Sequence, residues 1–156
     1  MIEQLAAILM GSPSDKEFVD KITSMLDRFG VAHESKISSA HKSTTELLEI
    51  VKSYDVMDKE VVYIAVAGMS NALCGVLDGN TARPVITCSP TLNQLNAVDI
   101  YSALRMPKGI GCTVVVAPEA AAVAAAKIFA LNNQSVKEKL EQYKTELREK
   151  INKANE

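Results

Sequence analysis

The 156-residue sequence has few of the side chains that bind soft metals or form disulfides. It contains three cysteines and two histidines, and the cysteines are widely spaced without a CxxC pair. An odd number of scattered cysteines argues against a disulfide framework and against a structural zinc site. We therefore expect a protein that works without a bound metal or any other cofactor.

Aromatic residues and long apolar runs are also scarce. Aromatics make up 4% of the chain and tryptophan is absent, so the stacking platforms of single-strand binders are missing. The formal net charge of −2 provides no overall attraction toward nucleic acid or an anionic membrane. No apolar run is long enough to span a bilayer, and the first residues lack the basic region followed by an apolar region that a signal peptide has. We predict a cytoplasmic protein that binds neither nucleic acid nor membranes.

Short apolar runs alternate along the chain with segments whose apolar residues have helical spacing. Five short apolar runs predict strands, at residues 5–10, 31–37, 61–67, 84–88 and 112–116. Apolar residues at helical spacing predict helices, at about residues 14–29, 43–54, 73–77, 99–104, 118–131 and 134–151. Parallel neighbours need helical crossovers, so this order predicts an α/β three-layer sandwich, a central parallel sheet with helices on both faces.

Local signals predict where individual helices begin and end. Ser14 with Glu17, and Ser43 with Glu46, form capping-box patterns at the starts of the first two long helices. Gly30 follows the last apolar residue of the first helix and predicts its end. We expect the alanine-rich helix at 118–131 to pack closely against a neighbour.

One domain is the expected organisation, since two domains of this total length would each have a thin core. Residues 1–133 carry all the predicted strands, and residues 134–156 add a highly charged helix to the same domain. That helix has a single apolar stripe, made of Val136, Leu140, Tyr143, Leu147 and Ile151. We expect the helix to lie outside the central core and to pack on the domain or on a neighbouring subunit.

The loops after the first three strands are the places to look for chemistry. In a parallel α/β sheet the ligand lies beyond the carboxyl ends of the strands. These loops are rich in glycine, serine and titratable or amide side chains, at residues 11–15, 38–42 and 67–71.

The first loop suits a phosphate group. Gly11 permits close backbone approach, Ser12 and Ser14 supply hydroxyls, and a helix begins directly afterwards. The loop has neither the GxxxxGK[ST] nor the GxGxxG pattern, so neither a triphosphate nor NAD is predicted. Asp15 can accept hydrogen bonds from a ribose or can complement the helix dipole. The alternative for the whole loop is an ordinary helix cap.

The second loop carries a candidate proton carrier. His41 follows a predicted strand, where an imidazole can move a proton near neutral pH. Lys42 beside it can meet a phosphate, and Ser39 adds a hydroxyl. The alternative is a hydrogen-bonded structural histidine, which is the interpretation we prefer for His33 inside the second strand. We interpret Cys74 as a packing residue, because no further histidine is left to activate it.

Four motifs together resemble one enzyme family. They are M-G-S-P-S-D (Met10–Asp15), S-A-H-K (Ser39–Lys42), A-G-M-S-N-A-L (Ala67–Leu73) and R-M-P-K-G (Arg105–Gly109). In this order and spacing they resemble phosphoribosylaminoimidazole carboxylase, the PurE family of purine biosynthesis, over about residues 5–133. The resemblance implies a flavodoxin-like fold, a homo-octamer and active sites at subunit boundaries.

The resemblance also favours one branch of that family. One branch rearranges N5-carboxyaminoimidazole ribonucleotide and carries a histidine in an A-G-G-A-A-H-L-P-G stretch after the third strand. The other, class II, carboxylates 5-aminoimidazole ribonucleotide (AIR) with CO2 and carries G-R-S-N-A-L or G-R-S-N-G-L. Gly68–Leu73 is similar to the second pattern, and no histidine follows His41. The direct carboxylase is the expected activity, with the mutase and a non-catalytic nucleotide-binding module as alternatives.

Roles for individual residues follow from the same resemblance. His41 is the expected general acid/base; Ser12, Ser14 and Lys42 hold the phosphate, Asp15 the ribose. The expected substrate-binding set is Gly11, Ser12, Ser14, Asp15, Ser39, Ala40, Lys42, Ala67, Gly68, Met69, Ser70, Asn71 and Leu73. Two positions depart from the family pattern, since Met69 stands in place of an arginine and Lys42 in place of the arginine of many members.

Overall fold

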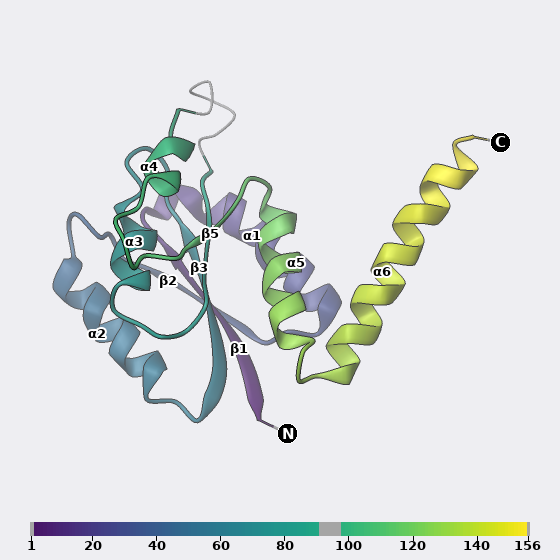
Figure 1. The fold of residues 1–156 in the computed structure, drawn as a ribbon, viewed down its shortest axis with the longest axis horizontal. Coiled ribbons are helices and arrows are strands. Elements are labelled where there is room, and N and C mark those ends of the chain that lie inside the picture. Colours follow the sequence, from purple (N-terminus) through teal and green to yellow (C-terminus); the bar gives the residue numbers. More distant parts are fainter. Residues whose placement is uncertain (1, 91–97, 156) are drawn as a thin grey trace.

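The computed structural model describes residues 2–90 and 98–155, and in them a parallel sheet lies between two layers of helices (Figure 1). The strands are β1 (Glu3–Met10), β2 (His33–Ile37), β3 (Lys59–Val66), β4 (Val85–Cys88) and β5 (Thr113–Val115). The helices are α1 (Lys16–Phe29), α2 (Thr44–Asp55), α3 (Ala72–Asp78), α4 (Ile100–Leu104), α5 (Pro118–Phe129) and α6 (Gln134–Lys153). A short 3₁₀ helix, Pro13–Asp15, precedes α1.

The strand order is β2-β1-β3-β4-β5, and every neighbouring pair is parallel. The predicted α/β sandwich with helices on both faces is confirmed. β1 and β3 occupy the middle, where Ile8 pairs with both Ser35 and Ile64. Because helices cover both faces there, these two strands are apolar almost without alternation.

Two hydrophobic clusters fill the spaces on either side of the sheet. Ala6, Ile8 and Met10 of β1 face α1 and α5, while Leu5, Ala7 and Leu9 face α2 and α3. Four alanines of α5, Ala121, Ala122, Ala125 and Ala126, are fully buried. Their small side chains let α5 approach α1 and the sheet closely, as the alanine-rich pattern predicts.

Both predicted capping boxes are wrong in detail. At the first helix the 3₁₀ turn moves the cap forward, so that Ser12 Oγ accepts the hydrogen bond from Ser14 N at 3.3 Å. At the second, Ser43 makes no side-chain cap because its Oγ accepts a hydrogen bond from Ser39 N at 2.9 Å. The prediction for Gly30 is confirmed: it ends α1 with a left-handed φ of 69°.

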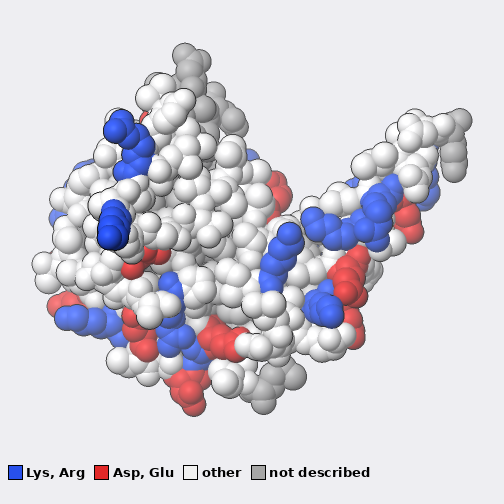
Figure 2. Space-filling model, viewed as in Figure 1, with Lys and Arg blue, Asp and Glu red and all other residues white. Residues whose placement is uncertain are grey.

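The helix α6 begins in the core and then leaves it. Val136 and Leu140 are 2% and 7% exposed and join the cluster between the sheet, α1 and α5. Further along, Tyr143 packs on Phe29, whereas Leu147 and Ile151 are exposed. The expectation that this helix lies wholly outside the central core is therefore wrong for its first two turns. Its remaining turns project from the body (Figure 1) and carry charges of both signs (Figure 2).

None of the helices in the described ranges combines the length and the apolar character that crossing a membrane requires.

Candidate active site

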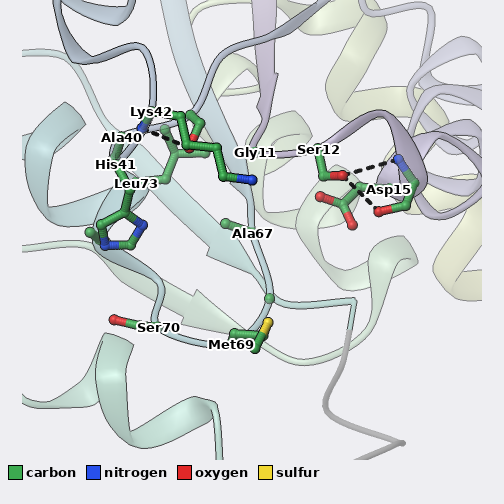
Figure 3. Close-up of a pocket in the computed structure, with 14 residues that line it drawn as sticks. Gly11, Ser12, Asp15, Ala40, His41, Lys42, Ala67, Met69, Ser70 and Leu73 are labelled. Atoms are coloured by element: carbon green, nitrogen blue, oxygen red, sulfur yellow. Dashed lines mark hydrogen bonds between the residues drawn. The ribbon is translucent and has the colours of Figure 1, made fainter.

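A cavity of about 450 Å³ lies where β1, β2 and β3 end, at the carboxyl edge of the sheet (Figure 3). The three loops selected from the sequence converge here because their strands are neighbours in the sheet. The lining residues are Gly11, Ser12, Ser14, Asp15, Ser39, Ala40, His41, Lys42, Ala67, Gly68, Met69, Ser70, Ala72 and Leu73.

Asn71 is the one predicted site residue that the structure places elsewhere. Its side chain is 2% exposed, donates a hydrogen bond to Thr87 Oγ1 at 2.8 Å and accepts one from Cys74 N at 3.4 Å. An asparagine directly before a helix is a common N-cap, and Asn71 has this role for α3. Ala72, which lines the cavity in its place, carries no chemical signal in the sequence.

The first loop presents two hydroxyls beside the half-buried carboxylate of Asp15. Ser12 Oγ and Ser14 Oγ share a hydrogen bond of 2.8 Å, and Gly11 N donates to Val66 O at 2.9 Å. Burial raises the pKa of Asp15, and a hydrogen bond from the backbone of Ser12 partly offsets this rise. In Figure 3 the Asp15 carboxylate lies next to Ser12, on the side of the cavity toward which the Lys42 ammonium extends.

The second loop is closed on itself by hydrogen bonds. Ser43 Oγ accepts from Ser39 N, and Ser43 N donates to Ser39 O at 2.9 Å. Lys42 N donates to Ser39 Oγ at 3.3 Å. These contacts use the serine hydroxyls and leave the side chains of His41 and Lys42 exposed at the cavity. The His41 ring lies on the side where Ser70 stands (Figure 3).

The third loop contains a residue in an unfavourable backbone conformation. Met69 has φ 59°, the left-handed region, which costs a residue with a Cβ roughly 1–2 kcal/mol. Its amide donates to Asp99 Oδ2 at 2.6 Å, and the next amide but one, Asn71 N, donates to Ser102 Oγ at 3.0 Å. Sequence reasoning missed Asp99 and Ser102, which lie about thirty residues further along the chain.

Cys74 behaves as the packing residue that the sequence predicted. It is fully buried on α3, and the Cys112 thiol donates a hydrogen bond to its backbone oxygen at 3.1 Å. A hydrogen bond from the Cys112 thiol lowers the pKa of Cys74, and the same contact together with burial raises that of Cys112. Neither cysteine lines the cavity.

In chemical terms, the cavity has groups that can bind an anion at one end and a group that can transfer a proton at the other. Hydroxyls, an ammonium group and the start of a helix gather at the first loop, where a phosphate fits. His41 provides the one imidazole of the cavity lining. The other histidine of the chain, His33, does not line the cavity and contacts Asp27 of α1. Within residues 2–90 and 98–155, no three metal-ligating side chains of the His, Cys, Asp and Glu types cluster together.

Residues 5–150 match the family model for AIR carboxylase. The chain belongs to the AIR carboxylase family. The match extends beyond residue 133 and includes most of α6, so this helix is part of the family's common sequence. Membership connects the chain to purine biosynthesis.

Individual relatives of the AIR carboxylase family support the assignment over almost the whole chain. A phosphoribosylaminoimidazole carboxylase from Archaeoglobus fulgidus is 45% identical, over 97% of this chain and 83% of that protein. The crystal structure of Treponema denticola PurE has a TM-score of 0.94 and 38% sequence identity, covering 97% of this chain and 96% of that one.

Animal proteins match as well, but only in part of their length. The human bifunctional phosphoribosylaminoimidazole carboxylase/phosphoribosylaminoimidazole succinocarboxamide synthetase is 44% identical over 85% of this chain. The present chain spans about a third of that protein, 31% of its length.

Proposed function

We propose that this chain carboxylates AIR directly with CO2, giving 4-carboxy-5-aminoimidazole ribonucleotide, without ATP or a cofactor. The observation that carries the proposal is the pocket itself. The Gly68–Leu73 stretch, which resembles the CO2-using branch, faces a cavity whose only histidine is His41. The mutase branch places a second histidine after the third strand, and this chain has none there.

The chemistry requires one mobile proton and a held substrate. The amino group of AIR makes ring carbon C4 electron-rich, so C4 attacks CO2 and forms the new C–C bond. The carbon–oxygen π electrons move onto oxygen and give the carboxylate, and the C4 proton must then leave. His41 accepts this proton as a general base, and gives it back in the reverse reaction.

The other side chains bind the two ends of the substrate. Ser12, Ser14 and Lys42 hold the phosphate through hydroxyls and a charge-assisted contact. Asp15 accepts hydrogen bonds from the ribose. The base and CO2 lie against the second and third loops, where the lining is Ser39, Ala40, Ala67, Gly68, Met69, Ser70 and Leu73. Asn71 acts indirectly here, since its side chain caps α3 and bonds Thr87.

An assay with two substrates tests the proposal. Purified protein is incubated with AIR and bicarbonate without ATP, with and without carbonic anhydrase, and carboxylated product is followed. We expect product formation that is faster when carbonic anhydrase supplies CO2. Rapid conversion of N5-carboxyaminoimidazole ribonucleotide with no use of AIR and CO2 would assign the chain to the mutase branch. Binding of AIR without either conversion would indicate a non-catalytic module.

Met69 offers a second test of the branch. Its side chain is 69% exposed at the cavity, where the family pattern has an arginine. If a guanidinium at this position contacts substrate, Met69→Arg lowers the apparent KM for CO2 or for AIR. Unchanged constants would mean that the methionine is a neutral replacement.

We further propose that the chain assembles into a homo-octamer, as the family resemblance implies. The support in this structure is apolar surface on elements near the cavity. Tyr101 and Leu104 on α4 are 63% and 56% exposed, and Ile37 at the end of β2 is 53% exposed. Tyr101 and Leu104 stand three positions apart on α4 and therefore share one face, and exposed apolar side chains that gather on one surface are usually covered.

A further inference from the structure

Helix α4 reaches over the third loop of the cavity from a distant part of the sequence. Ser102 of α4 and Asp99, the N-cap residue directly before the helix, both contact the loop backbone. Asp99 Oδ2 accepts the hydrogen bond of Met69 N at 2.6 Å, and Ser102 Oγ accepts that of Asn71 N at 3.0 Å. The cavity lining contains neither Asp99 nor Ser102, so they touch the loop and not the ligand space.

The Ser102 hydroxyl is itself held in a fixed orientation. Its Oγ lies 2.8 Å from Asp99 O and 3.3 Å from Met69 O, and its single proton is directed to these carbonyls. Its oxygen is thereby turned to accept from Asn71 N. One hydroxyl thus joins the start of α4 to the loop on both sides of Ser70.

The loop needs such support because its conformation is not the one its sequence prefers. Met69 is the only non-glycine residue with positive φ in the described ranges. A residue with a side chain leaves the left-handed region unless its surroundings hold it there. The contacts from α4 fall on Met69 itself and on the residue two positions later, so they define the path of the loop through Ser70.

We propose that Asp99 and Ser102 are positioning residues that hold loop 67–71 in its catalytic shape. The inference rests on the proposed function, because the loop shape matters only if it places Gly68, Met69 and Ser70 against the reacting base and CO2. The phosphate and ribose contacts belong to the first two loops. Loss of Asp99 or of Ser102 therefore affects the chemical step more than the affinity for the ribonucleotide.

Ser102→Ala is the main test, and the chain provides a matched control. On α2, Ser53 Oγ donates to Ile50 O at 2.7 Å, the same i to i−3 contact that Ser102 makes to Asp99 O, but it touches no loop of the cavity. We expect Ser102→Ala to lower kcat about tenfold, the worth of one or two lost hydrogen bonds, with KM for AIR within about twofold. Ser53→Ala should leave both constants unchanged.

A conservative series at Asp99 separates positioning from charge. Asp99→Ala removes the acceptor and should lower kcat at least as much as Ser102→Ala. Asp99→Asn keeps a carbonyl oxygen for Met69 N and should restore most of the lost kcat. Adding Met69→Asn to Asp99→Ala should also recover activity, because asparagine tolerates the left-handed region better than methionine.

Hydrogen exchange provides a readout that does not need turnover. Ser102→Ala should speed exchange at Asn71, and Asp99→Ala at Met69, about tenfold or more in segment 67–74, while α2 is unchanged. Unchanged kcat in both alanine variants, or equal losses in Ser53→Ala, would overturn the proposal. If the wild-type protein shows no turnover with AIR and CO2, the proposed function fails. Unchanged exchange in both variants would then overturn the positioning role separately.

Discussion

At the scale of single residues, His41 combines an exposed imidazole with a rigid support. The backbone of the loop beneath it is tied by the contacts between Ser39 and Ser43. We expect His41→Asn to bind the ribonucleotide nearly as well as the wild type but to lose about 10²–10⁴-fold in kcat. Steady-state kinetics measure kcat, and calorimetric titration with AIR measures the affinity for the ribonucleotide.

His33 provides the control for that measurement. Its ring contacts the Asp27 carboxylate at 3.0 Å and lies away from the cavity lining. His33→Asn should keep kcat. Weak binding with undiminished turnover in His41→Asn would reverse its assignment from acid/base to ligand contact.

Lys42 extends its ammonium group toward the first loop, where the phosphate is proposed to lie. Lys42→Ala should weaken nucleotide binding by about 1–3 kcal/mol, the cost of losing a charge-assisted hydrogen bond. The penalty should shrink for the corresponding nucleoside, which has no phosphate.

Lys36 is the matched control for Lys42. It lies over the Tyr54 ring, 4.8 Å from the ring centre, and does not line the cavity. Lys36→Ala should therefore leave nucleotide binding unchanged. An equal penalty for nucleotide and nucleoside in Lys42→Ala would exclude the phosphate contact.

We expect Asp15 to make nucleotide binding depend on pH in a defined direction. Burial raises its pKa, so the carboxyl gains a proton at a pH above the ordinary aspartate value of about 3.9. A protonated carboxyl accepts ribose hydrogen bonds less well. Affinity for AIR should be full above the raised pKa and fall as pH decreases through it. The Asp15→Asn variant should bind AIR more weakly at neutral pH, and its affinity should no longer fall as the pH decreases. If its affinity varies with pH as that of the wild type does, Asp15 does not bind the ribose.

At the scale of elements, α6 separates into two parts with different tasks. Val136 and Leu140 are buried, and burying such side chains stabilises a fold by about 1.5–3 kcal/mol each. Truncation after Asn133 should therefore lower the free energy of unfolding measurably. Truncation after Lys144 removes the exposed Leu147 and Ile151 together with the partly exposed ion pair between Glu146 and Arg28, and such pairs contribute about 1 kcal/mol or less, so it should lower monomer stability far less. Chemical denaturation of both truncated chains measures the difference, and equal losses would contradict this division.

Local sequence patterns predicted the existence of these elements better than their capping contacts. Apolar periodicity located all five strands, and Gly30 marked the end of α1 correctly. The serine caps were assigned wrongly because a hydroxyl near a helix start has several backbone donors within reach. Which donor it accepts from depends on the turn geometry, as with Ser43 and Ser39 N.

At the scale of the whole molecule, the exposed apolar side chains predict association. We expect sedimentation velocity to show an oligomer, most simply an octamer, at micromolar concentration. Leu104→Glu should weaken assembly, since it places a charge on an exposed apolar surface of α4. Lys153→Glu, at the exposed end of α6, is a control that changes charge without removing apolar area. A monomer for the wild-type chain would refute the assembly.

The sequence by itself determined the parallel α/β architecture and almost all of the cavity lining. Strand and helix periodicity are local, and the carboxyl ends of parallel strands share one edge, so loops 11–15, 38–42 and 67–71 had to face the same region. The tertiary structure alone decided the strand order, the inward turn of Asn71, the burial of Val136 and the contact of Asp99 and Ser102 with the third loop. Each of these depends on a partner far away in the chain, and a local pattern contains no information on which distant group will complete a hydrogen bond or cover an apolar face.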